Sequence, residues 1–100
     1  MIFITQLIFV KSGAEKTFQK FEEFAIPLME KYNGKIIYRL RPTEESYISG
    51  DKDRPYEIHF ISFDSEEDLN NFLSDDTRLS FLHLKEQSVR STLLIKGHKM

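Results

Sequence analysis

The sequence predicts an α+β fold made of a single domain, residues 1–100, with a four-stranded antiparallel sheet and helices on one face of it. Three observations predict this fold. Apolar residues recur in the order β-α-β-β-α-β along the chain. A chain of 100 residues is long enough for one compact domain and too short for two. The first and last strands are apolar on both sides, which is typical of strands that are covered twice.

The first strand is expected at residues 2–10, which are mostly β-branched and aromatic. Alternation divides its apolar side chains between two faces: Ile2, Ile4, Ile8 and Val10 on one, and Phe3, Leu7 and Phe9 on the other. The segment is too short to span a bilayer. It also lacks the basic start and the cleavage site of a signal peptide, so we interpret it as a strand of the mature protein.

The first helix is predicted to begin at a capping box, Ser12 with Glu15. Its apolar stripe recurs at steps of three and four residues: Phe18, Phe21, Ala25, Leu28, Met29 and Tyr32. Pro27 is expected to kink the helix. The pair Asn33-Gly34 is expected to end it, with the glycine in the left-handed conformation.

The second strand is expected at residues 35–41, followed by a long polar loop at 42–55 that includes a short extended piece near Tyr47. A loop of this length in a small domain is often functional. The third strand is expected in the segment RPYEIHFISF, residues 54–63. A capping box of Asp64 and Glu67 then predicts another helix, which is interrupted at residues 74–76.

A further helix is expected to carry Leu79, Leu82 and Val89, and the last strand to occupy residues 91–97. With right-handed crossovers, this order gives the ferredoxin-like plait. Helices then cover one sheet face only, so we expect a second copy to cover the other face in a homodimer. A charged residue in place of Leu7 or Leu94 is expected to break the dimer if that position lies on the uncovered face.

Composition excludes several classes of function. A formal net charge of −2 gives no electrostatic reason to expect a nucleic acid or an anionic membrane as partner. The absence of cysteine fits the reducing cytoplasm. The three histidines have no metal-ligand spacing, and no glycine-rich phosphate loop is present, so we expect neither a metal nor a cofactor.

Three segments resemble a known group of proteins: PLMEKYNGKIIYR, YEIHFISFDSEEDLNNFLSD and STLLIKG. The chain resembles the small stand-alone members of the dimeric α/β-barrel superfamily, in particular a bacterial family of short uncharacterised proteins. The resemblance implies a homodimer in which two sheets form a barrel. The superfamily includes cofactor-free monooxygenases, isomerases, haem-handling enzymes and stress-responsive proteins, so the resemblance implies the fold more than the reaction.

The candidate catalytic residues are His59, Glu57 and Arg39. Alternation places Glu57 and His59 on one face of the third strand, and we expect this face to point into the dimer barrel because the other set is more apolar. The neighbouring second strand brings Arg39 and Arg41 beside them. Such a group can anchor an anionic or enolisable substrate, with His59 as general base. The alternative is a network of ion pairs that only satisfies polar groups at the dimer seam.

Three further residues are candidates for binding a small-molecule ligand. Tyr38 and Tyr47 offer phenolic hydroxyls, as does Tyr56, although Tyr38 and Tyr56 can instead lie at the edge of a core. His83 either faces a cleft between helix and sheet or is a half-exposed helical residue. Two functions stay open: a cofactor-free oxygenase or isomerase acting on a small aromatic or polyketide-like compound, and a dimeric ligand-binding or stress-associated module without turnover.

Overall fold

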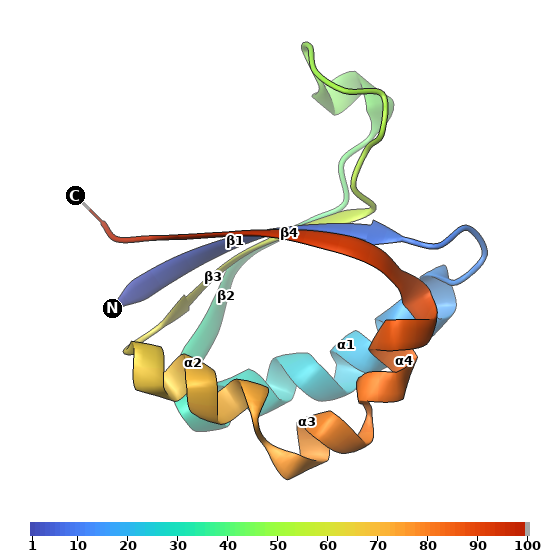
Figure 1. The fold of residues 1–100 in the computed structure, drawn as a ribbon. Coiled ribbons are helices and arrows are strands. Elements are labelled where there is room, and N and C mark those ends of the chain that lie inside the picture. The colour runs from blue at the N-terminus through green and yellow to red at the C-terminus, as the bar shows by residue number, and fades with distance from the viewer. Residues whose placement is uncertain (100) are drawn as a thin grey trace.

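The computed structural model describes residues 1–99 and consists of one sheet with its four α-helices on a single face (Figure 1). The strands are β1 (Ile2–Val10), β2 (Gly34–Leu40), β3 (Glu57–Phe63) and β4 (Val89–Gly97). The helices are α1 (Glu15–Met29), α2 (Glu66–Leu73), α3 (Asp76–Ser80) and α4 (Leu82–Ser88). The strand order is β2-β3-β1-β4 and every neighbouring pair is antiparallel. The predicted ferredoxin-like α+β fold is therefore confirmed.

The core lies between the sheet and the helices and is rich in phenylalanine, as the composition indicates. β1 contributes Ile2, Ile4 and Ile8, and α1 contributes Phe18 and Phe21, all buried. Phe63 of β3 is completely buried and packs against Phe72 of α2, with ring centroids 5.6 Å apart. Each such side chain contributes about 2–3 kcal/mol on burial, so this layer supplies most of the packing free energy.

The end of α1 differs from its prediction. The helix runs through Pro27 to Met29 and continues as a 3₁₀ turn at Glu30–Tyr32. Asn33, with φ of 58°, takes the left-handed conformation that we expected at Gly34. Gly34 is required for a different reason: a Cβ there would lie 2.6 Å from the Phe63 ring. The glycine therefore allows β2 to pass close to the core.

Two predicted helix starts are also displaced. α1 has Ala14 at its N-cap without a side-chain bond, and Glu15 instead accepts a hydrogen bond from the backbone of Gly13. α2 is capped by Ser65, whose hydroxyl accepts from the backbone N–H of Asp68. Short polar residues in series offer several cap positions, and the tertiary packing chooses among them.

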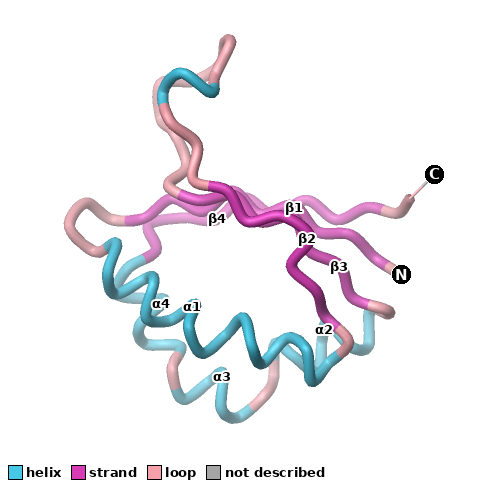
Figure 2. Tube along the Cα trace, turned by 180° about the vertical axis from the view of Figure 1, so that it is seen from behind, coloured by secondary structure: helices cyan, strands magenta, loops and turns pink. Residues whose placement is uncertain are grey.

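Residues 41–56 form an arm that rises from the sheet on the side opposite the helices (Figures 1 and 2). It contains a 3₁₀ turn at Glu44–Ser46 but no strand, although Tyr47 has an extended backbone. Ile48 is fully exposed on the arm. The guanidinium of Arg54 lies 4.1 Å from the centre of the Tyr47 ring, which ties the two sides of the arm together.

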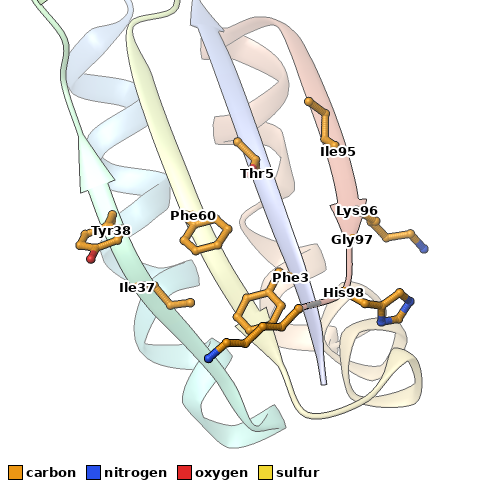
Figure 3. Close-up of a pocket in the computed structure, with 10 residues that line it drawn as sticks. Phe3, Thr5, Ile37, Tyr38, Phe60, Ile95, Lys96, Gly97 and His98 are labelled. Atoms are coloured by element: carbon orange, nitrogen blue, oxygen red, sulfur yellow. The ribbon is translucent and has the colours of Figure 1, made fainter.

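The face of the sheet opposite the helices is apolar and uncovered in the single chain. Figure 3 shows Tyr38, Phe60, Phe3 and Ile95 on this face, one from each of the four strands. Tyr38 and Ile95 are each more than half exposed. Residues 1–99 contain no helix of the length and apolarity that crossing a membrane requires.

Candidate functional site

Glu57 and His59 lie on the helix-covered face of β3, not on the open face where we expected them. Both are buried, with exposed fractions of 0% and 3%. Their neighbours Ile61 and Phe63 complete the same face and belong to the core. The set that we expected under the helices, which includes Ile58 and Phe60, instead forms the open face. Tyr56 is an exception, because its ring contacts Phe18 of α1 and its hydroxyl accepts from Gln19.

Glu57 is the centre of a hydrogen-bonded network that joins β2 and β3. The Nε groups of Arg39 and Arg41 donate to its two oxygens over 3.0 and 2.9 Å. His59 Nε2 lies in hydrogen-bond contact with Oε2 of the same carboxylate. The sequence predicted that these four residues would meet, and the register confirms it, because Arg39 lies directly opposite His59.

The ionisation of Glu57 follows from these contacts. Burial by itself raises the pKa of Glu57, but the hydrogen bonds from His59, Arg39 and Arg41 outweigh burial and lower the pKa to about 2. The carboxylate is therefore ionised throughout the physiological range. An ionised carboxylate accepts hydrogen bonds only, so Nε2 of His59 must carry the proton that they share.

That proton fixes the tautomer of His59. With Nε2 protonated, a neutral imidazole carries its lone pair on Nδ1. Among residues 1–99, no hydrogen-bond partner contacts Nδ1. His59 also lines a cavity between the sheet and the helices. The ring thus lines the cavity, has an ionised carboxylate paired to its Nε2, and has an Nδ1 that can accept a proton.

The cavity has a volume of about 320 Å³ and a mainly apolar wall. Its lining includes Ile4, Phe18, Phe21, Phe63 and Phe72. This volume is at the lower end of those that hold small-molecule ligands. The open face carries a larger hollow of about 540 Å³, but neither Glu57 nor His59 contributes to it (Figure 3).

Glu22 of α1 is a site residue that the sequence interpretation missed. It is only 8% exposed and lines the cavity beside His59. Burial raises its pKa, and the positive charge of a protonated His59 opposes this effect. A signal was present in the sequence, because Glu22 stands on the apolar stripe of α1, four residues after Phe18 and three before Ala25.

The same group of side chains has the donor set of a metal site. One ligand atom each from Glu22, Glu57 and His59 lies within 4.8 Å of the other two. However, both oxygens of Glu57 already accept from guanidinium groups. These fixed positive charges oppose a cation at the same place. The arrangement is therefore better suited to proton transfer than to metal binding.

The remaining candidates lie elsewhere. Tyr38 stacks on Phe60 on the open face, with ring centroids 6.3 Å apart. Tyr47 lies at the base of the arm, in a hollow of about 360 Å³ shared with Leu40 and Ile58. His83 is exposed on α4 and does not line the cavity. The structure thus brings Arg39, Arg41, Glu57 and His59 together and separates Tyr38, Tyr47 and His83 from them.

Comparison with known proteins supports the fold and leaves the reaction open. No protein-family model and no curated protein sequence matches the chain. Among solved structures, it is similar to a protein of unknown function from Rhodopseudomonas palustris, with a TM-score of 0.86, 12% identity and coverage of 99% of this chain and 82% of that one. It is also similar to an uncharacterised NIPSNAP domain protein from Burkholderia xenovorans (TM-score 0.72, 8% identity, coverage 100% and 95%).

A third similar structure comes from Nitrosomonas europaea and is named as a candidate antibiotic biosynthesis monooxygenase. Its TM-score is 0.75 at 9% identity, with coverage of 100% of this chain and 99% of that one. At such identities the similarity shows that the fold is shared and does not extend to the reaction.

Proposed function

We propose that the protein is an enzyme that removes a proton from a small, largely apolar compound bound between the sheet and the helices. The observation that carries this proposal is His59, which is buried, paired through Nε2 with an ionised carboxylate, and unpaired at Nδ1 beside a cavity. A base positioned in this way, with a carboxylate to stabilise the imidazolium, is a common arrangement for general base catalysis.

The cavity also holds a proton donor. Burial raises the pKa of Glu22, so this carboxyl group keeps its proton to a higher pH than an exposed glutamate does. A base and a carboxylic acid on the wall of one cavity can accept a proton at one atom and return it at another. His59 takes the proton from an acidic C–H group, and Glu22 protonates the resulting anion at a different position, which is an isomerisation.

The same carbanion can react directly with dioxygen. Protonation of the adduct gives a hydroperoxide. Where the same carbon carries a second hydrogen, loss of that proton and cleavage of the O–O bond release water and leave a carbonyl group. The net reaction is a monooxygenation in which one atom of dioxygen enters the product and the other leaves as water. This second reaction is favoured by the similarity to the candidate monooxygenase from Nitrosomonas europaea. Both reactions begin with the removal of a proton by His59, so one experiment on this proton transfer tests the step that they share.

The test is exchange of deuterium from D₂O into 2-tetralone, an enolisable aromatic ketone, followed by NMR. We expect the wild-type protein to accelerate the exchange. The acceleration by His59→Gln should be at least tenfold smaller than that by the wild type, because general base catalysis is lost. His83→Gln is the matched control, because this histidine is exposed on α4. If wild type and His59→Gln exchange at the same rate, the proposed role of His59 is wrong. A measurement of oxygen consumption then distinguishes the two reactions, because the oxygenase consumes dioxygen and the isomerase does not.

The assembly is part of the same proposal: two copies pack their open sheet faces together. The support is the exposed apolar surface, which includes Tyr38, Leu93 and Ile95 at 61%, 54% and 56% exposure. A contiguous surface of this kind is usually covered by a partner. Leu94 lies on the other side of β4, opposite Gln6, and lines the cavity, so Leu93 is the better position to test.

A further inference from the structure

The cavity contains two cationic side chains that form no salt bridge with any of residues 1–99. Arg78 of α3 and Lys85 of α4 both line it. Within residues 1–99, neither forms a salt bridge, whereas Arg39 and Arg41 are paired with Glu57. In addition, the Nε group of Arg78 is buried and has no hydrogen-bond partner. A buried donor without a partner is costly, so an acceptor brought to this guanidinium by a ligand in the cavity would be stabilised.

Arg78 is held in place although its Nε is free. Its guanidinium lies 5.3 Å from the centre of the Phe72 ring, and Nη1 donates to the backbone oxygen of Leu73 over 3.2 Å. At its own backbone, the N–H donates to the Asp75 carboxylate that caps α3. Little side-chain entropy is left to be lost on binding, which favours recognition by a positioned group.

The electrostatics of the cavity favour an anion. Burial lowers the pKa of Lys85, and the nearby positive charge of Arg78 lowers it further. The nearest acidic group on the wall, Glu22, has a raised pKa because of burial, so it compensates these charges only in part. Glu57 is already occupied by two arginines and His59. An anion placed between Arg78 and Lys85 would stabilise both charged forms.

We infer that the ligand of this cavity is a small aromatic carboxylate, with its carboxylate between Arg78 and Lys85 and its ring against the phenylalanines. A volume of about 320 Å³ and an apolar wall suit one or two fused rings. The guanidinium fits a planar carboxylate through parallel N–H donors, which favours this anion over a spherical one. The inference names the substrate class of the proposed function and rests on it for the reaction, but ligand binding can be measured without turnover.

The test uses 2-naphthoate and its neutral analogue 2-naphthamide. Because the chain contains no tryptophan, the naphthalene fluorescence can be followed without an indole background. We expect the wild-type protein to bind the acid at least tenfold more tightly than the amide. Arg78→Gln and Lys85→Gln should each remove most of this preference, since a hydrogen bond to a charged group contributes about 1.5–3 kcal/mol, roughly ten- to hundredfold in affinity. Arg78→Lys should retain part of it.

The matched controls are Arg90→Gln, at an exposed arginine paired with Asp53, and Lys20→Gln, at an exposed lysine of α1. Neither should change the preference, and thermal unfolding shows whether each variant is folded. Equal affinity for acid and amide in the wild type, or a preference that survives Arg78→Gln and Lys85→Gln, would overturn the inference. His59→Gln should still bind 2-naphthoate. The anion site and the proton transfer can therefore fail separately.

Discussion

Replacing Glu57 by glutamine tests the network in which His59 is held. The substitution keeps the shape of the side chain and removes its charge. It also brings an amide donor to a place where the guanidinium donors of Arg39 and Arg41 already point. His59 loses the ionised acceptor that fixes its tautomer. We therefore expect both a loss of stability and a loss of proton transfer.

The magnitude follows from the pKa of Glu57. The pKa falls from a reference of 4.5 to about 2 in the folded protein, a difference of 4.5 − 2 = 2.5 units. At 1.36 kcal/mol per unit, the ionised carboxylate contributes about 3 kcal/mol at neutral pH. Because the folded pKa is the lower one, this contribution is complete well above pH 4.5 and disappears as the pH falls toward 2. By pH 3.5 part of it, on the order of 1 kcal/mol, is lost.

The assay is urea unfolding, followed by circular dichroism, from pH 7 to pH 3.5 at one fixed protein concentration, since association would add to the apparent stability. Glu57→Gln should cost about 3 kcal/mol at pH 7 and visibly less at pH 3.5. The control Glu66→Gln removes the exposed pair with Lys96 and should cost under about 1 kcal/mol. A cost for Glu57→Gln that is equally large at both pH values would refute the assignment of the stability to an ionised carboxylate.

Three further variants test separate parts of the structure. Gly34→Ala should destabilise the fold by about 1–3 kcal/mol in chemical unfolding, because the added Cβ meets the buried Phe63 ring at 2.6 Å; an unchanged stability would contradict the close approach. Glu22→Gln should raise the thermal midpoint at pH 8 and have less effect below pH 4.5, since a raised folded pKa costs stability as the pH rises; a loss at pH 8 would contradict this sign. Leu93→Asp should convert the dimer to monomer in native mass spectrometry, whereas Leu79→Asp, at an exposed leucine of α3, should not. A dimer that persists in Leu93→Asp would remove the open face as the interface.

The sequence predicts the topology because the periodicity of apolar residues reports it directly. Alternation also predicts correctly which side chains share a face of a strand, so Arg39, Glu57 and His59 meet as expected. It does not report which face the helices cover. The rule that the covered face is the more apolar one fails on β3, because the polar groups there satisfy one another and are therefore tolerated inside.

The other differences have local causes. A register shift between Ile36 and Tyr38 changes which side chains of β2 share a face. The amino-acid sequence alone does not predict this shift. Arg78 and Lys85 reach the cavity because α3 and α4 are two short helices, where the sequence pattern predicts one. Phe81 forms the turn between the two helices, because it ends α3 and precedes α4. Glu22, by contrast, could have been found as the one charged residue within the buried stripe of α1.

The two buried carboxyl groups of the site, Glu57 and Glu22, have different pKa values. The difference comes from their hydrogen-bond partners more than from how deeply they are buried. Glu57 accepts from three side chains, which together outweigh the effect of burial and lower its pKa, whereas Glu22 accepts no hydrogen bond from residues 1–99 and burial keeps its pKa raised. Between a pH of about 2 and the raised pKa of Glu22, the first is ionised and the second carries a proton. A reaction that needs Glu22 as proton donor must therefore slow as the pH rises through that value, and Glu22→Gln must remove this alkaline limb. If the limb persists in the variant, Glu22 is a structural residue and the proton is returned by another group.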